Sequence, residues 1–254
     1  MTSVITRRTF ASMTGGGFVI ALVAGCRISE AGQGADGRLT ARPRSGVSTS
    51  ARSDRLGLDV DRDALLRLPS DASTAPLPLL VYLHGATQRG EGMLRRIGAA
   101  TDAAGIAVLA PDSRSMTWDA IRGDFGVDVV FLNRALQRVF DTVAVDPSRV
   151  AIGGFSDGAT YALSLGAING DLFTHVIANS PGFIVDGQPH GRPRFYVSHG
   201  TADQILPIDQ CSRQIVPALR RRGYDVTFKE FAGRHEIPPE IADEAARWFV
   251  DRVR

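Results

Sequence analysis

Apolar residues along most of this chain gather in short runs that end at small or polar residues, with longer mixed segments between them. Such runs are typical of buried strands, and the mixed segments place apolar residues at the spacing of amphipathic helices. Strands are expected at residues 64–68, 79–83, 107–110, 150–155, 176–179, 195–198 and 226–231. Helices are expected at residues 92–104, 127–142, 156–167, 209–222 and 239–250.

This alternation predicts an α/β fold, in which one mostly parallel sheet carries helices on both faces. Residues that follow the strands then gather at the carboxyl edge of the sheet, where such sheets bind ligands. No segment between the predicted elements is long enough to form a large lid. We therefore expect an open cleft above that edge.

Ser156 lies in Gly-Phe-Ser-Asp-Gly, at the junction of the strand 150–155 and the helix that follows it. Glycines two positions to each side relieve crowding, so that a serine on such a turn projects its hydroxyl into a cleft. A bare match to this pattern is often only a glycine-rich turn. The flanking strand and helix favour a nucleophile elbow with Ser156 as the nucleophile.

A serine hydroxyl needs a histidine to take its proton and a carboxylate to orient that histidine. In this kind of hydrolase the acid and the histidine follow the serine in that order. Asp203 comes after the strand 195–198, and His235 comes after the strand 226–231. These two residues are the predicted acid and base, with Asp209 as the reserve acid; Asp209 also suits a helix start.

The other four histidines are expected to be structural or solvated. His84 ends the strand 79–83 but precedes Ser156, in a loop better suited to shaping the oxyanion site. His175 opens a strand, His190 lies in a loop rich in glycine and proline, and His199 ends the strand that presents the acid.

Acyl transfer places negative charge on the former carbonyl oxygen, which backbone N–H groups can stabilise. The predicted donors are the N–H groups of Asp157, directly after the nucleophile, and of Ala86, in the loop 84–88. Trp118 is the predicted substrate contact, beside the acyl or alcohol group. Packing beneath the cleft is the alternative interpretation for this side chain.

Four motifs resemble those of the α/β-hydrolase superfamily over residues 56–254: Leu-His-Gly at 83–85, the serine motif at 154–158, His-Gly-Thr-Ala-Asp at 199–203 and Gly-Arg-His at 233–235. The chain looks most like small bacterial serine esterases of the phospholipase/carboxylesterase and polyhydroxybutyrate-depolymerase-like groups. This resemblance implies a Ser-His-Asp triad and no cofactor. Dienelactone hydrolases are of similar size but carry cysteine at the elbow, where this chain has Ser156.

The sequence therefore predicts hydrolysis of a small-molecule carboxylic ester through an acyl-enzyme. Two alternatives remain open at this point. One is a serine peptidase or amidase that uses the same three residues. The other is a lipid-anchored binding protein on an inactive hydrolase scaffold.

The first residues of the chain resemble a bacterial export signal. Thr-Arg-Arg-Thr-Phe at 6–10 looks like a twin-arginine motif, and a short apolar stretch and Val-Ala-Gly-Cys at 23–26 follow. Residues 23–26 match the lipobox, in which the cysteine receives a lipid. We expect a signal peptide at 1–25, lipidation of Cys26, and a lipoprotein anchored to a membrane on the extracytoplasmic side.

Residues 26–55 are rich in small and polar residues and are expected to be a flexible linker to a catalytic domain at 56–254. A hydrophobic content of 44% is enough for a core, and a net charge of +2 gives no nucleic-acid signature. With Cys26 lipidated, Cys211 is left as a buried thiol without a disulfide. No spacing typical of a metal site is found, and nothing indicates the oligomeric state.

Overall fold

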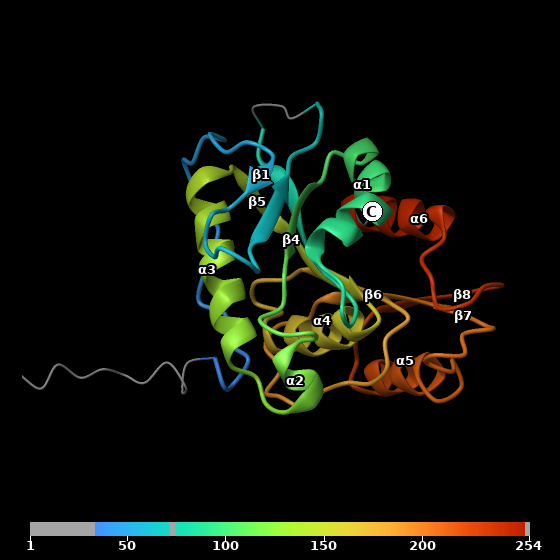
Figure 1. The fold of residues 1–254 in the computed structure, drawn as a ribbon. Helices are drawn as coiled ribbons and strands as arrows, with labels where there is room; N and C mark the ends of the chain where they lie inside the picture. Colours follow the sequence, from blue (N-terminus) through green and yellow to red (C-terminus); the bar gives the residue numbers. More distant parts are fainter. Residues whose placement is uncertain (1–33, 72–74, 252–254) are drawn as a thin grey trace, which may run out of the picture.

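The computed structural model describes residues 34–71 and 75–251, and its centre is one sheet of eight strands (Figure 1). The order across the sheet is β1-β2-β4-β3-β5-β6-β7-β8. In chain order, the strands are β1 (Asp54–Arg55), β2 (Ala64–Arg67), β3 (Leu77–Leu83), β4 (Ala107–Pro111), β5 (Val145–Phe155), β6 (His175–Asn179), β7 (Arg194–Gly200) and β8 (Val226–Phe231).

The six strands from β4 to β8 along this order run parallel, and only β1 and β2 pair antiparallel at one edge. Because parallel neighbours end at the same edge, the residues after β3, β5, β7 and β8 are brought to one side of the molecule. The predicted, mostly parallel sheet is confirmed.

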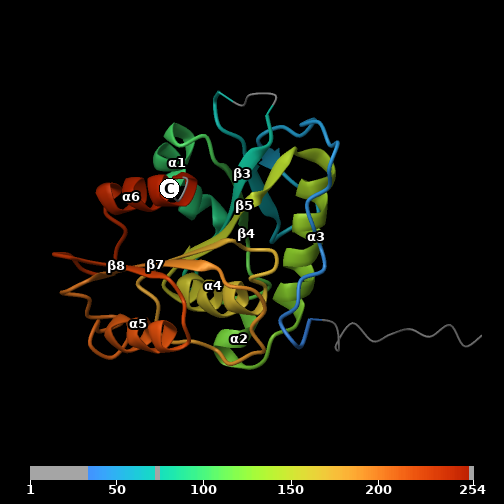
Figure 2. The same ribbon diagram turned by 180° about the vertical axis from the view of Figure 1, so that it is seen from behind.

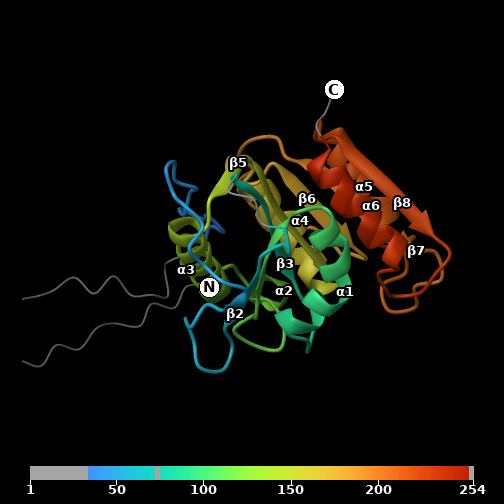
Figure 3. The same cartoon turned by 90° about the horizontal axis from the view of Figure 1, so that it is seen from above.

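Helices cover both faces of the sheet (Figures 2 and 3). On one face α1 packs against α6, and the other face carries α3, α4 and α5. The bounds are α1 (Gly90–Ala103), α2 (Asp119–Arg122), α3 (Val127–Thr142), α4 (Asp157–Ile168), α5 (Ser212–Arg221) and α6 (Pro239–Val250). Within the described residues, no helix has both the length and the apolar content needed to cross a membrane.

Side chains of the central strand β3 alternate between two apolar cores. Leu79, Val81 and Leu83 belong to the core under α3 and α4. Leu80 and Tyr82 belong to the core under α1 and α6. Because successive strand residues point to opposite faces, a strand buried on both sides must be apolar throughout, which explains its unbroken apolar run.

The predicted helices 127–142 and 239–250 are confirmed to the residue. The sequence did not indicate the two-residue β1 or the single-turn α2. Helix α1 begins at Gly90, two residues before the prediction, because the Asp112 carboxylate accepts a hydrogen bond from the Gly90 N–H. That partner lies 22 positions away, so local sequence could not reveal it.

The described part of the predicted linker is not a free tether. Residues 34–51 lie along α3 and the end of α4, with Leu39 and Ala41 buried in the core. The Asn133 side chain accepts hydrogen bonds from the Thr40 and Ala41 N–H groups. We call residues 34–51 the N-terminal strap. The sparse apolar residues in this segment concealed its docking, because backbone groups make most of these contacts.

The Asn169 side chain bonds to the backbone of the N-terminal strap as both donor and acceptor. This fully buried side chain accepts from the Leu39 N–H at 2.8 Å and donates to the Gly37 carbonyl at 2.8 Å. Beside it, Arg38 and Arg42 both pair with Asp171. The predicted signal peptide and the predicted lipidation site, Cys26, lie outside the described residues.

Substitution of Asn169 by alanine is expected to destabilise the domain by about 2–4 kcal/mol, because a buried N–H and a buried carbonyl lose their partner. Urea unfolding of the full chain would measure this loss. Gln137→Ala on α3 is the control and should cost about 0.5 kcal/mol or less. If Asn169→Ala unfolds like the control, the strap does not contribute to the fold.

Candidate active site

Ser156 lies on a strained turn between β5 and α4, with φ 57° and ψ −121°. The turn is possible because glycines allow close approach at two points. A Cβ on Gly154 would lie 2.4 Å from the Gly158 carbonyl, and a Cβ on Gly158 would lie 2.3 Å from the Leu83 oxygen. Any side chain at these positions would clash with backbone, so the elbow depends on both glycines.

The structure brings Asp203 and His235 together across the ends of β7 and β8. The imidazole Nδ1 donates to the Asp203 Oδ2 at 2.6 Å. The other carboxylate oxygen accepts the N–H groups of Ile205 and Leu206, each at 2.9 Å. Burial disfavours the charged carboxylate, but these hydrogen bonds and His235 outweigh it and hold the pKa of Asp203 below its usual range. The acid is therefore ionised at neutral pH.

His235 also lies beside the elbow. Its ring centroid is 4.7 Å from that of Phe155, the residue directly before Ser156. Among the described residues no hydrogen bond joins the Ser156 hydroxyl to the imidazole. Contacts of this kind are often long in an unliganded site and tighten when substrate binds.

Asp209, the reserve acid, is not part of this cluster. Its carboxylate pairs with Arg213 on α5 and is exposed to solvent. Asp203 is therefore the carboxylate that the fold presents to His235.

A second imidazole supports the acid, which sequence reasoning missed. His199 is fully buried, and its Nε2 donates to the Leu206 carbonyl at 2.7 Å and lies 3.2 Å from the Asp203 Oδ2. Its Nδ1 accepts from the Ser212 hydroxyl. Burial lowers the pKa of His199, against the opposing effect of the Leu206 carbonyl, so the ring is neutral. The expected structural role of His199 agrees with this geometry, and its contact with the acid is new.

The loop 84–88 passes directly beside the nucleophile, since a Cβ on Gly85 would lie 3.2 Å from the Ser156 Cβ. The Thr87 N–H is committed to the Met116 carbonyl at 2.6 Å. In the described part of the chain, the Ala86 N–H has no hydrogen-bond partner. Asp157 opens α4, where the first N–H groups lack acceptors within the helix. Both predicted oxyanion donors thus keep an N–H group available beside Ser156.

The buried His84 side chain links this loop to the segment that follows β4. The imidazole Nδ1 donates to the Gly85 carbonyl at 2.7 Å, and Nε2 accepts from the Ser113 N–H at 2.9 Å. Burial lowers the pKa of His84, which is consistent with the neutral tautomer that these two bonds require. The structural role expected for His84 is confirmed.

The predicted substrate contact of Trp118 is wrong. The side chain is fully buried, and its indole N–H donates to the His84 carbonyl at 2.8 Å. The ring lies between His84 and Tyr161, at centroid distances of 5.0 and 5.3 Å. A large aromatic residue after a strand suits a cleft wall and a packed floor equally well in sequence, and here the second alternative holds.

Residues 113–118 connect the two predicted oxyanion elements. Ser113, Met116 and Trp118 all bond to the loop 84–88, as described above. Thr117 completes the connection, because its hydroxyl donates to the Asp157 carboxylate at 2.5 Å. The sequence contained no local signal for Thr117, since its partner is 40 residues away.

Exposed apolar side chains follow three strands at this same edge. Met116 is 55% exposed after β4, Phe183 is 47% exposed after β6, and Ile205 is 70% exposed after β7. We call Met116, Phe183 and Ile205 the apolar rim, because all three follow strands that end at this edge.

Backbone strain is concentrated at the site. Within the described residues, only Thr87, Ser156 and Ser180 have positive φ without being glycine, and each follows a strand end at the carboxyl edge. Such conformations persist where the surrounding structure enforces them, and they cluster at functional sites. Ser180 is fully buried and its hydroxyl has no partner.

The chain resembles known proteins in sequence over part of its length. It is 30% identical over 186 residues to the candidate esterase NocK of Nocardia uniformis subsp. tsuyamanensis, covering 67% of this chain and 53% of that protein. It is 26% identical over 132 residues to acyl-protein thioesterase 1 of Emericella nidulans, covering 48% of this chain and 55% of that protein. The chain thus spans about half the length of these relatives, and no family model matches it.

Solved structures share the architecture more completely. A carboxylesterase from Mesorhizobium loti superimposes with a TM-score of 0.60 at 18% identity, covering 79% of this chain and all of that one. The chain has the α/β-hydrolase fold.

Replacing Ser180 by glycine is expected to stabilise the domain by about 1 kcal/mol. Relief of positive φ and loss of an unpartnered hydroxyl outweigh the greater freedom of glycine in the unfolded chain. The thermal midpoint should rise by about 2–4 °C. Ser180→Ala, which removes only the hydroxyl, should fall between the two; an unchanged or lower midpoint for the glycine variant would contradict the strain argument.

Proposed function

We propose that this protein is a serine hydrolase that cleaves carboxylic esters through an acyl-enzyme. The observation that carries the proposal is the 2.6 Å bond between His235 and Asp203 next to the strained Ser156 turn. This arrangement supplies Ser156 as the nucleophile, His235 as the base and the ionised Asp203, which holds the base in position. Relatives named as an esterase and as a thioesterase support the same reaction class.

In the proposed mechanism the Ser156 Oγ attacks the ester carbonyl, and His235 Nε2 takes the hydroxyl proton. Asp203 keeps the Nδ1–H fixed and stabilises the imidazolium. The N–H groups of Ala86 and Asp157 stabilise the oxyanion. The same imidazole then gives its proton to the leaving alcohol, and water hydrolyses the acyl-enzyme with the roles reversed.

The substrate class is a small ester with an apolar part, which the rim of Met116, Phe183 and Ile205 would contact. Thioesters are cleaved by the same steps, and the relative from Emericella nidulans is named for that activity. Amides require stronger assistance to the leaving group. Parallel assays with a 4-nitrophenyl ester, its thioester and its 4-nitroanilide would rank the three, and anilide cleavage at the ester rate would favour the peptidase alternative.

The triad is tested by labelling the full chain with a fluorophosphonate probe. Ser156→Ala should abolish the adduct, and His235→Ala should slow its formation at least about 100-fold, because the serine loses its base. Ser148→Ala, at an exposed serine of β5, is the matched control and should label normally. Labelling that survives both Ser156→Ala and His235→Ala would refute the triad, and the absence of any adduct would favour a binding protein.

We further propose that the protein is an exported lipoprotein, anchored through Cys26 on the extracytoplasmic side of a membrane. Support comes from the twin arginines, the apolar stretch and the lipobox-like residues 23–26. In a bacterial host, Cys26→Ser should move the protein from the detergent phase to the aqueous phase. Cys211→Ser, at the buried thiol on the N-terminal side of α5, should not; unchanged partitioning of Cys26→Ser would contradict the anchor.

A further inference from the structure

We propose that the site prefers esters that carry a negative charge, and that Arg96 on α1 binds this charge. The inference rests on the proposed ester hydrolysis and specifies its substrate. It starts from an open hollow of about 530 Å³, which the end of the loop 84–88, Arg89 and the first turns of α1 line. Its lining residues are Gln88, Arg89, Glu91, Gly92, Arg95 and Arg96.

The hollow begins close to the reacting serine. A Cβ on Gly85 would lie within 3.2 Å of the Ser156 Cβ and 3.6 Å of the Gln88 Nε2, so Gln88 joins the elbow to the hollow. Arg96 also lines the hollow, and its guanidinium lies 5.2 Å from the centre of the Phe155 ring, which also contacts His235. Since the His235 ring centre lies 4.7 Å from the same Phe155 ring centre, the Arg96 guanidinium is at most about 10 Å from the centre of the imidazole.

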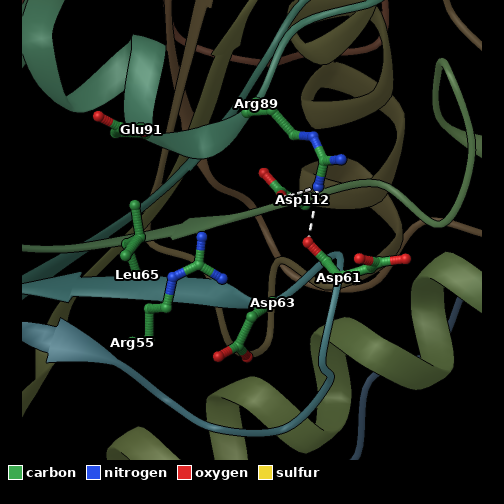
Figure 4. A pocket seen from close by; sticks show the side chains of 7 residues that line it. All are labelled: Arg55, Asp61, Asp63, Leu65, Arg89, Glu91 and Asp112. Carbon is green, nitrogen blue, oxygen red and sulfur yellow. Dashed lines mark hydrogen bonds and ion pairs between the residues drawn. The ribbon is translucent and has the colours of Figure 1, made fainter.

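Two of the three arginines are occupied by protein partners. Figure 4 shows Arg89 turned toward a neighbouring cavity of about 180 Å³, where it bonds to the Asp112 carboxylate and the Asp61 carbonyl. Arg95 pairs with Glu91, four positions earlier on the same helix, at 2.6 Å. Their charges are already largely balanced.

Arg96 differs from its neighbours. In the described part of the chain it has no carboxylate within ion-pair distance, and its side chain is exposed above Phe155. An aromatic face holds a guanidinium in place while leaving its N–H edge free to bind an anion. A carboxylate or phosphate a few bonds from the ester carbonyl would reach this edge while the carbonyl lies at Ser156.

The test compares matched esters in the full-length protein: 4-nitrophenyl hydrogen glutarate, which is anionic, and 4-nitrophenyl pentanoate, which is neutral. A second pair, 3-acetoxybenzoate and its methyl ester, places the charge on the leaving group. We expect kcat/KM to favour the anionic member of at least one pair. Arg96→Gln should reduce that preference about 3- to 10-fold, as should high salt, because the charge is at the rim of an exposed site.

Arg96→Lys keeps the charge and should retain part of the preference. Arg138→Gln, at an exposed arginine of α3 far from the hollow, is the matched control and should leave it unchanged. If the wild type shows no preference, or if Arg96→Gln keeps it in full, the inference is overturned while neutral-ester turnover upholds the proposed function. If neither member of either pair is cleaved, the proposed function fails and the inference fails with it.

Discussion

The site depends on one steric constraint, the contact between the start of α4 and the end of β3. Gly158 lies against the Leu83 carbonyl with no room for a Cβ, and Gly154 lies equally close to the Gly158 carbonyl. This contact fixes the turn that carries Ser156 at positive φ, and it places the loop after β3 beside the serine. Both Ser156 and the loop 84–88 are therefore held by backbone packing, which does not depend on any side-chain rotamer.

Around this contact, hydrogen bonds from buried polar groups hold the loops of the site in place. His84 and residues 113–118 brace the loop after β3, and Thr117 extends the brace to Asp157. His199 and two backbone N–H groups brace the acid in the same way. Each partner is neutral or a fixed dipole, so the charge of Asp203 is solvated by protein groups that need no rearrangement when His235 becomes protonated.

Sequence alone revealed the parts of this structure that local chemistry determines. The parallel sheet followed from apolar runs, and Ser156, Asp203 and His235 followed from their places after strands. Trp118 was misassigned because its partners, His84 and Tyr161, are distant in sequence. Thr117, His199 and the docking of the N-terminal strap were missed for the same reason, since hydrogen bonds between remote segments leave no periodic pattern.

The N-terminal strap changes what counts as the folded unit. Leu39 and Ala41 belong to the core under α3. Without this segment, Asn169 would lose its bonds to Leu39 and Gly37, and Asn133 would lose its bonds to Thr40 and Ala41. A recombinant fragment that starts at β1 would expose apolar core residues to water and would leave side-chain amides of α3 and of the end of α4 without these partners. A protease site placed within the strap would consequently report on release of this segment, so that cleavage kinetics there would follow the equilibrium between the docked and the released strap.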